Sequence, residues 1–300
     1  MIIDVHKAQD AIILVNFNSS SDTIECINSI KKETVDVSVI VVDNCSNEDE
    51  LLILNKCDED ITIIRSDTNL GFAAGNNIAI KFILEQCSNI KNIILLNNDT
   101  VIEPQMIEKL RNRNNGKSIS VPRMMYFDEP DVVWFGGGVF NRWTGRAIHV
   151  GMNKHIGEYQ ENSRCDFATG CCMLIPIDIC RKLGCLDESY FMYCEDTEYC
   201  LRAKRNGIEI NYVPDAVLYH KLGRSSGGGE SAFSLYYMTR NRLRYLNDYK
   251  EMFFFTATPF TICSRLLRII QFRLKRKSKS DAIIMGLIDY YRGNVGRNRF

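Results

Sequence analysis

The sequence lacks long apolar runs, paired cysteine motifs and any net charge. No stretch reaches the ~20 apolar residues of a membrane-spanning helix, and the longest candidate, residues 252–263, is shorter and contains Pro259. The first ten residues, MIIDVHKAQD, lack the apolar core of a secretory signal. The twelve cysteines include no Cys-x-x-Cys pair and match no zinc spacing. We therefore expect a cytoplasmic protein whose thiols are reduced and mostly buried.

The composition is that of an ordinary globular protein. Of the 300 residues, 45% are hydrophobic and 25% are charged, which excludes disordered, collagen-like and coiled-coil classes. The charges are unevenly distributed: residues 1–234 carry 23 basic and 33 acidic side chains, whereas residues 235–300 carry 14 and 4. A basic segment on an acidic body predicts contact with an anionic partner.

Short apolar runs alternate with helical patterns through the first hundred residues. The runs predict strands at residues 11–17, 37–43, 61–65 and 92–97. The helical patterns cover residues 22–32, 51–56 and 75–86. Buried β-branched runs separated by helices indicate an α/β fold, in which helices cover both faces of a mostly parallel sheet.

Polar side chains follow three of these strands. They are Asn16 and Asn18, then Asp43 and Asn44, then Asn97, Asn98 and Asp99. Because ligands bind at the carboxyl ends of strands in such sheets, we expect these residues to form a site.

The second half of the chain mixes short strands, turns and helices. Residues 118–165 suggest short strands and turns, and further strands are expected at residues 167–176 and 209–213. Helices are expected at residues 177–183, 196–207 and 233–249, with a flexible Gly-rich loop at 223–229.

Seven short motifs occur in order between about residues 10 and 245. They are VNFN, VVDNCS, NLGFAAGNN, LLNNDT, ATGCCMLIP, LDESYFMYCEDTEYCLR and YHKLGRSSG. This series resembles glycosyltransferase family 2, most closely its rhamnosyltransferase-like branch. The resemblance implies a Rossmann-like GT-A fold, a nucleotide-sugar donor, a divalent metal and inversion at the anomeric carbon. It places a GT-A catalytic domain at residues 1–234, with a donor half at 1–110 and an acceptor half at 111–234, before a basic helical extension at 235–300.

The resemblance assigns the donor nucleotide to the strand ends. Asp43 would accept hydrogen bonds from the base or ribose, helped by Asn16, Asn18 and Asn44. Without the family pattern, an Asp that caps a helix or forms an Asx turn would be the better interpretation. Asn69, Gly71 and Gly75 lie in a loop that the family places beside the donor. The glycines would let the backbone approach a ligand closely, although a plain helix entry is the alternative.

The resemblance also places a metal site at residues 97–99. Asp99 would be the principal ligand of Mg²⁺ or Mn²⁺, with Asn97 where the family often has an Asp, and His220 would complete the site. The alternatives are an Asp that caps a helix starting near Pro104 and a core histidine. Arg224 and Ser225 would close over the diphosphate, unless their Gly-rich segment is only a linker.

Two adjacent carboxylates are the candidates for the catalytic base. By resemblance, Asp196 removes the proton of the acceptor hydroxyl and Glu195 supports it or binds acceptor. The alternative is a pair of helix N-terminal charges, which is our interpretation of Glu198. Arg240 and Asn241 match a family Arg-Asn pair whose role the residues themselves do not reveal.

Residues 252–279 combine apolar and basic side chains. Five apolar positions fall on one helical face: Ile262, Leu266, Ile269, Ile270 and Leu274. Seven cations accompany them without an acid: Arg265, Arg268, Arg273, Lys275, Arg276, Lys277 and Lys279. Such a helix can lie on the anionic inner face of a cell membrane; the alternative is a helix packed on the catalytic domain with a solvated basic face. No nucleic-acid motif is present, so we expect no nucleic-acid partner.

The expected function is transfer of a sugar from dTDP-rhamnose or a UDP-hexose to a polysaccharide or lipid-linked oligosaccharide. A catalytically inactive scaffold is the rival outside enzymes, because Asn97 departs from the metal motif. A nucleotidyltransferase is the rival within enzymes, but VNFNSSSDT lacks the Gly- and Lys/Arg-rich signature expected after its first strand.

Overall fold

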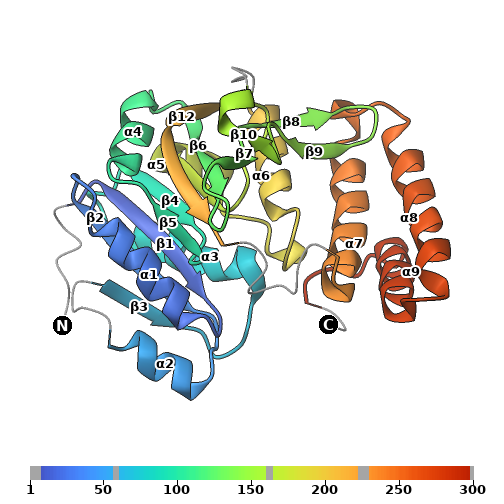
Figure 1. Ribbon diagram of the computed structural model, residues 1–300, viewed down its shortest axis with the longest axis horizontal. Coiled ribbons are helices and arrows are strands. Elements are labelled where there is room, and N and C mark those ends of the chain that lie inside the picture. Colours follow the sequence, from blue (N-terminus) through green and yellow to red (C-terminus); the bar gives the residue numbers. More distant parts are fainter. Residues whose placement is uncertain (1–7, 57–60, 160–164, 222–229, 298–300) are drawn as a thin grey trace.

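Four parallel strands form the first half of the central sheet (Figure 1). The computed structural model describes residues 8–56, 61–159, 165–221 and 230–297. β1 (Asp10–Asn16) lies between β2 (Val37–Asp43) and β4 (Asn92–Leu96), and β3 (Ile61–Arg65) pairs with β2. Ile12, Ile13 and Ile40 are fully buried, as expected for strands that are covered on both faces.

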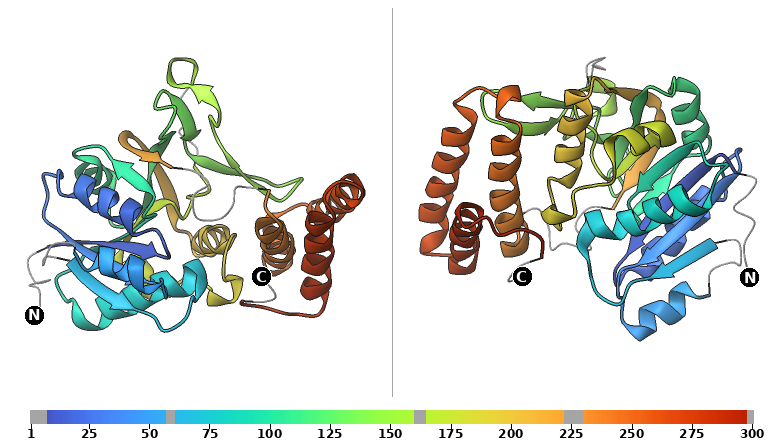
Figure 2. Two further views of the ribbon diagram at one scale, coloured as in Figure 1. Left: turned by 60° about the horizontal axis from the view of Figure 1, so that its bottom comes forward. Right: turned by 180° about the vertical axis from the view of Figure 1, so that it is seen from behind.

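Helices cover both faces of this half. α1 (Ser20–Ile30) and α3 (Gly71–Gln86) lie on opposite faces, and α2 (Glu48–Leu54) lies beside the β3 edge (Figures 1 and 2). α3 begins four residues before the expected start at residue 75, because the glycines of its motif lie in its first turns rather than in a preceding loop. The α/β fold predicted from the periodicity is confirmed.

The second half extends the sheet with mixed pairing. β11 (Cys172–Pro176) runs antiparallel to β4 and contacts β6 (Ser118–Tyr126). β7 (Val132–Phe135) and β10 (Lys154–His155) complete that edge. The remaining elements of this half are β5 (Thr100–Ile102), α4 (Met106–Arg113), β8 (Gly138–Asn141), β9 (Arg146–His149), α5 (Ile177–Leu183), α6 (Glu195–Arg205) and β12 (Glu209–His220).

β12 is longer than the predicted strand at residues 209–213. Its pairing with β6 shifts register between Val213 and Val217 and then continues, while the end of β12 pairs with β5. His220 therefore lies opposite Thr100, immediately after Asp99. Because β12 continues past this irregularity, it brings the motif of His220 beside the motif of Asp99, more than a hundred residues away in the sequence.

Three helices form the C-terminal part. α7 (Ala232–Asp248), α8 (Ala257–Arg273) and α9 (Lys277–Tyr291) pack side by side, and the β8–β9 hairpin reaches across to them (Figure 1). The Phe254 amide donates to the Arg142 carbonyl oxygen, and the Thr256 hydroxyl donates to the Trp143 carbonyl oxygen. Among the described residues, no helix has both the length and the apolar character to cross a bilayer.

α8 buries polar side chains and exposes apolar ones, the reverse of an ordinary surface helix. Its buried residues are Ala257, Thr261 and Arg265. Its exposed residues include Leu266, Leu267 and Ile270, and the C-cap residue Leu274 is 94% exposed. The helix does pack on its neighbours, but its outer face is apolar as well as basic, so a purely solvated basic face is not what the structure has.

Candidate functional site

Asn16 and Asp43 end adjacent strands in direct register. The Asn16 amide donates to Asp43 Oδ1 at 3.2 Å, and the Ser46 backbone N–H donates to Asp43 Oδ2 at 3.3 Å. Asp43 is fully buried, and the N-cap of α2 is Asn47 rather than Asp43. The Asp43 carboxylate thus organises the strand ends and forms a local turn bond, while a carboxylate retains further acceptor positions for a ligand.

Asn44 connects the end of β2 to the start of α3. Its Oδ1 accepts from the Leu70 backbone N–H at 2.9 Å, and its Nδ2 donates to Asn69 Oδ1 at 3.2 Å and to the Gly71 carbonyl oxygen at 3.1 Å. Asn18, with a positive φ of 51°, accepts from the Asn47 backbone N–H at 2.9 Å. The structure therefore brings the predicted donor residues together at one edge of the sheet.

Gly71 and Gly75 allow close approach to the protein itself. Gly71 has φ +81°, and a Cβ there would lie 2.2 Å from the Phe191 carbonyl oxygen. A Cβ at Gly75 would lie 3.0 Å from Val15 Cγ1. Both glycines therefore allow tight packing of α3, against the segment before α6 and against β1. Their place beside the donor stays a prediction.

Asp99 faces His220 in the interior. His220 Nε2 lies 3.1 Å from Asp99 Oδ1, and both residues are 6% exposed. The buried His220 Nδ1 has no hydrogen-bond partner among the described residues. α4 begins at Met106 with Gln105 at its N-cap, so Asp99 does not cap that helix. Asp99 Oδ1 and His220 Nε2 are close enough to share one divalent cation, for which carboxylate oxygens and imidazole nitrogens are ligands.

The remaining metal ligands would have to come from elsewhere. Within the described ranges, no cluster of three or more His, Cys, Asp or Glu residues could hold a metal. The half-buried Asn97 donates its backbone N–H to the Cys171 carbonyl oxygen at 2.7 Å. A site with two protein ligands suits a cation that is completed by donor phosphates. Arg224 and Ser225 lie outside the described residues.

Asp196 is held by backbone donors at the start of α6. Its Oδ2 accepts from the Gly170 N–H at 2.9 Å, and its Oδ1 accepts from the Thr197 N–H at 2.6 Å. Because Cys171, the residue after Gly170, binds Asn97, residues 170–171 join the carboxylate pair to the predicted metal motif. This link between motifs is a relationship that sequence reasoning missed.

Glu195 and Asp196 differ in environment. Burial, and then the charge of Asp196, raises the pKa of Glu195 to about 8, and Glu195 Oε2 has no hydrogen-bond partner among the described residues. Burial also raises the pKa of Asp196, but the Gly170 and Thr197 N–H groups oppose that rise. Hydrogen bonds to the charged form favour ionisation. The backbone donors therefore favour the ionised form of Asp196, whereas burial without a partner favours the protonated form of Glu195.

The loop before α6 is strained and held by α7. Phe191, Tyr193 and Cys194 all have positive φ, between 63° and 70°, a costly conformation for side chains of this kind. Asn241 Nδ2 donates to the carbonyl oxygens of Tyr190, Met192 and Tyr193 at 2.8–2.9 Å. The Asn241 amide thus fixes the loop that carries Glu195 and Asp196.

Arg240 holds the same loop from the neighbouring position. It donates to the Tyr190 carbonyl oxygen at 3.2 Å and to the Gly296 carbonyl oxygen at 2.9 Å. The Arg-Asn pair, whose role the sequence did not reveal, is thus buried and structural.

Glu198 lies in the first turn of α6, as expected of a helix N-terminal charge, and also makes specific contacts. It is 6% exposed, its Oε2 lies 2.7 Å from Arg202 Nη2, and its Oε1 accepts from the Tyr249 hydroxyl at 2.5 Å. Tyr249 is 51 residues away and follows α7, so this contact joins α6 to the C-terminal helices.

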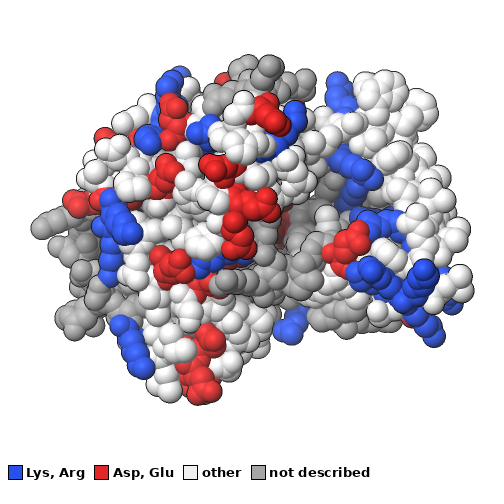
Figure 3. Space-filling view, viewed as in Figure 1, with Lys and Arg blue, Asp and Glu red and all other residues white. Residues whose placement is uncertain are grey.

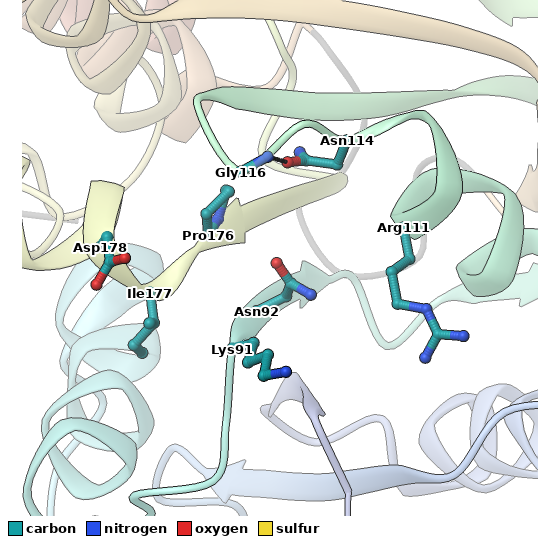
Figure 4. Close-up of a pocket in the computed structure, with 8 residues that line it drawn as sticks. All are labelled: Lys91, Asn92, Arg111, Asn114, Gly116, Pro176, Ile177 and Asp178. Atoms are coloured by element: carbon teal, nitrogen blue, oxygen red, sulfur yellow. Dashed lines mark hydrogen bonds between the residues drawn. The ribbon is translucent and has the colours of Figure 1, made fainter.

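A separate cavity lies at the opposite edge of the sheet. It measures about 310 Å³ and is lined by residues at the start of β4 and the end of β11, among them Asn92 and Pro176 (Figure 4). Its Arg111 pairs with Asp10, at the start of β1, with 3.4 Å between Nη1 and Oδ2. Because these are the strand ends remote from Asp43 and Asp99, the cavity is no part of the predicted donor site.

The family model of glycosyl transferase family 2 matches residues 11–184. The chain belongs to glycosyl transferase family 2. The low-salt glycan biosynthesis hexosyltransferase Agl10 of Haloferax volcanii is 28% identical over 239 residues, which cover 77% of this chain and 73% of that protein. The dTDP-rhamnosyl transferase RfbF of Shigella flexneri is 24% identical over 218 residues, covering 71% and 69%. This glycosyltransferase therefore has the rhamnosyltransferase-like relatives that its motifs predicted.

Solved structures confirm the GT-A fold of this glycosyltransferase. GalNAc-T7, solved with UDP, GalNAc and Mn²⁺, has a TM-score of 0.62 at 16% identity; the match covers 81% of this chain and 49% of that one. This chain thus spans about half the length of that structure. The mannosyltransferase PcManGT from Pyrobaculum calidifontis, solved with GDP-Man and Mn²⁺, has a TM-score of 0.59 at 9% identity, covering 97% and 89%.

Proposed function

We propose that this glycosyltransferase moves a sugar from a nucleoside diphosphate onto a hydroxyl of a polysaccharide or lipid-linked oligosaccharide, with inversion. The observation that carries the proposal is the link through residues 170–171. It joins Asp196, which can take a proton, to the motif of Asp99, which can hold a cation. A general base and a diphosphate site on either side of residues 170–171 suit in-line displacement of the diphosphate by the acceptor oxygen.

In the proposed reaction, one bond forms as another breaks. The acceptor oxygen bonds to the anomeric carbon, and the bond from that carbon to the donor diphosphate oxygen breaks. Asp196 Oδ2 or Oδ1 accepts the acceptor's proton, and the nucleoside diphosphate leaves. Because Glu195 is buried and protonated, it places no second negative charge beside Asp196.

We assign the donor to the edge formed by Asn16, Asn18, Asp43, Asn44 and Asn69. A dTDP-rhamnose or UDP-hexose donor is supported by the names of the relatives, a dTDP-rhamnosyl transferase and a hexosyltransferase. Asp99 and His220, with Asn97 beside them, would hold Mg²⁺ or Mn²⁺. When bound, the cation would neutralise charge on the leaving diphosphate.

We further propose a cytoplasmic enzyme that binds peripherally to an anionic membrane surface. The support is the outer face of α8, where Leu267 and Ile270 are 62% and 70% exposed beside Arg273. Figure 3 shows Lys and Arg gathered over the C-terminal helices, with Asp and Glu more frequent over the catalytic domain. A basic surface with an apolar strip suits an anionic bilayer.

The test of function is turnover by the purified chain. A panel of dTDP-, UDP- and GDP-sugars with Mn²⁺ should yield one nucleotide whose binding Asp43→Ala weakens by on the order of 1–3 kcal/mol, since buried hydrogen bonds are lost. Asp67→Ala, at an exposed position, is the control. Unchanged affinity in a folded Asp43→Ala protein would remove Asp43 from the site, and no turnover with any donor would favour a scaffold.

A further inference from the structure

Two arginines of the C-terminal helices, the buried Arg265 and the half-buried Arg242, have no acidic partner among the described residues. Arg265 is 6% exposed and makes no hydrogen bond among the described residues, and its Nε is fully enclosed. Arg242 Nη2 donates to the Thr144 carbonyl oxygen at 2.7 Å, but its Nε is buried without a partner. In the ranges that the structure describes, no carboxylate lies within 4.0 Å of either side chain.

The two side chains act on one another. Burial, and then the positive charge of Arg242, lowers the pKa of Arg265 to about 10, and Arg146 contributes in the same direction. Burial lowers the pKa of Arg242 as well. A buried charge without a partner of opposite sign is costly, as for Arg265, and a second cation beside it adds to that cost. A fold that retains them is expected to use them for a ligand of opposite charge.

Further unsatisfied polar groups accompany the arginines. Thr261 precedes Arg265 by one turn on the same face of α8, and its hydroxyl is buried without a partner among the described residues. The Thr144 hydroxyl, beside the carbonyl that Arg242 binds, is also buried and unpartnered there. Guanidinium forks and hydroxyl donors together match the oxygens of a phosphate or diphosphate.

Arg242 is linked to the loop that leads to Glu195 and Asp196: it follows Asn241, whose amide donates to the Tyr193 carbonyl oxygen at 2.8 Å. Burial raises the pKa of the Tyr245 hydroxyl, Arg242 and Arg265 lower it, and Asp196 raises it. The Tyr245 hydroxyl donates to the Gly145 carbonyl oxygen at 2.6 Å, next to the Thr144 carbonyl that Arg242 binds. Cys194, which precedes Glu195, is similarly influenced by both arginines.

We propose that Arg242 and Arg265, with the Thr144 and Thr261 hydroxyls, bind a phosphate or diphosphate group of the acceptor, and so present its sugar hydroxyl to Asp196. This inference rests on the proposed sugar transfer. The acceptor is favoured over the donor because the arginines come from α7 and α8, not from the strand ends that carry Asp43 and Asp99. A lipid attached to that phosphate could follow the exposed apolar face of α8. Figure 3 shows the surface hollowed between the catalytic domain and these helices.

The first experiment measures anion binding without catalysis. Calorimetry with inorganic pyrophosphate is done in EDTA, so that binding through a metal is removed. Arg265→Met and Arg242→Gln should each weaken pyrophosphate binding roughly tenfold or more, as expected for lost charged hydrogen bonds. Arg273→Gln, on the exposed side of α8, should change it little. Equal affinity in a folded Arg242→Gln, Arg265→Met double variant would overturn the site.

The second experiment separates the sources of the phosphate. Transfer is compared on two synthetic acceptors that share one sugar, a glycosyl diphosphate with a short lipid chain and a neutral alkyl glycoside. Arg265→Met should raise KM for the diphosphate acceptor at least about tenfold, with KM for the neutral acceptor and Kd for the donor nearly unchanged. A weakened donor Kd instead would assign the arginines to the donor and overturn the acceptor proposal. If no acceptor is used while pyrophosphate still binds through the arginines, the proposed transfer fails and the anion site stands.

Discussion

The side-chain amide of Asn241 lies 2.9 Å from the carbonyl oxygen of Tyr190 and holds the loop that leads to Glu195 and Asp196. This contact joins α7 to residues 190–194, three of which have positive φ. It explains why an Asn is needed there: its two amide hydrogens are shared by three carbonyl oxygens. Positioning of Asp196 thus depends on the C-terminal helices, outside the segment that the family model matches.

Asn241→Ala should impair catalysis more than donor binding. The variant leaves three loop carbonyls without their donor, so we expect a loss of about 1–3 kcal/mol in the free energy of unfolding and a fall in kcat. The donor Kd, measured by calorimetry, should stay near the wild-type value because the donor edge is formed by other elements. Asn247→Ala, an exposed position on the same helix, is the control. An Asn241→Ala enzyme with wild-type kcat would show that the loop needs no such anchor.

Asp196→Asn should bind donor and fail to transfer sugar. The amide keeps the shape of the side chain but cannot accept the acceptor's proton, so we expect a loss of roughly 10²-fold or more in rate. Single-turnover kinetics and donor calorimetry separate the two effects. Glu195→Gln should retain substantial activity, because Glu195 is already protonated near neutral pH. A dead Glu195→Gln beside an active Asp196→Asn would reverse the two roles.

Glu195 should make the folded state less stable as pH rises. Its pKa is raised from 4.5 to about 8 in the fold, so between these values the folded chain binds a proton that the unfolded chain has lost. The free energy of unfolding therefore decreases with rising pH across that window and levels off above about pH 8. Glu195→Gln should flatten this decline, which denaturant titrations at several pH values would measure. Parallel pH profiles for the two proteins would contradict the raised pKa.

Removal of divalent metal should abolish transfer. EDTA-treated protein should regain activity with Mn²⁺ or Mg²⁺, and Asp99→Ala should stay inactive because the principal carboxylate is gone. His220→Gln should need a higher Mn²⁺ concentration for half-maximal rate, since an amide binds the cation more weakly than an imidazole. Circular dichroism checks that both variants fold. Full activity in EDTA would mean that Asn97 marks a metal-independent enzyme.

The outer face of α8 should mediate reversible membrane binding. We expect co-sedimentation with anionic vesicles at low salt and release at high salt, because salt screens the attraction of the basic side chains. A Leu267→Glu, Ile270→Glu double variant should lose this binding without unfolding, as both side chains are exposed. Leu52→Glu, an exposed apolar position on α2, is the matched control. A wild-type protein that remains in the supernatant at low salt would leave this face without a membrane role.

Local patterns were sufficient to predict the sheet and its ligand edge. The strands at 37–43 and 61–65 were predicted with their observed bounds, because a buried parallel strand needs a continuous β-branched run, which is visible in a few residues. The same holds for the polar residues at the strand ends: the order of strands in a parallel sheet brings Asn16 beside Asp43 without any further information. The family and fold followed from seven motifs read in order.

The tertiary structure decided which of these residues work together. The pairing of Asp99 with His220 needs a strand that continues past an irregularity, and the anchoring of residues 190–194 needs an Asn about fifty positions away. The contacts of Glu198 with Tyr249 and of Gly71 with Phe191 were likewise not visible in the local sequence. In α8 the apolar stripe was visible in the sequence, but only packing revealed that it faces outward while Arg265 faces inward. Such contacts join segments that are far apart in the chain, so the side chains that meet are selected by the packing of whole elements and not by the periodicity of any one of them.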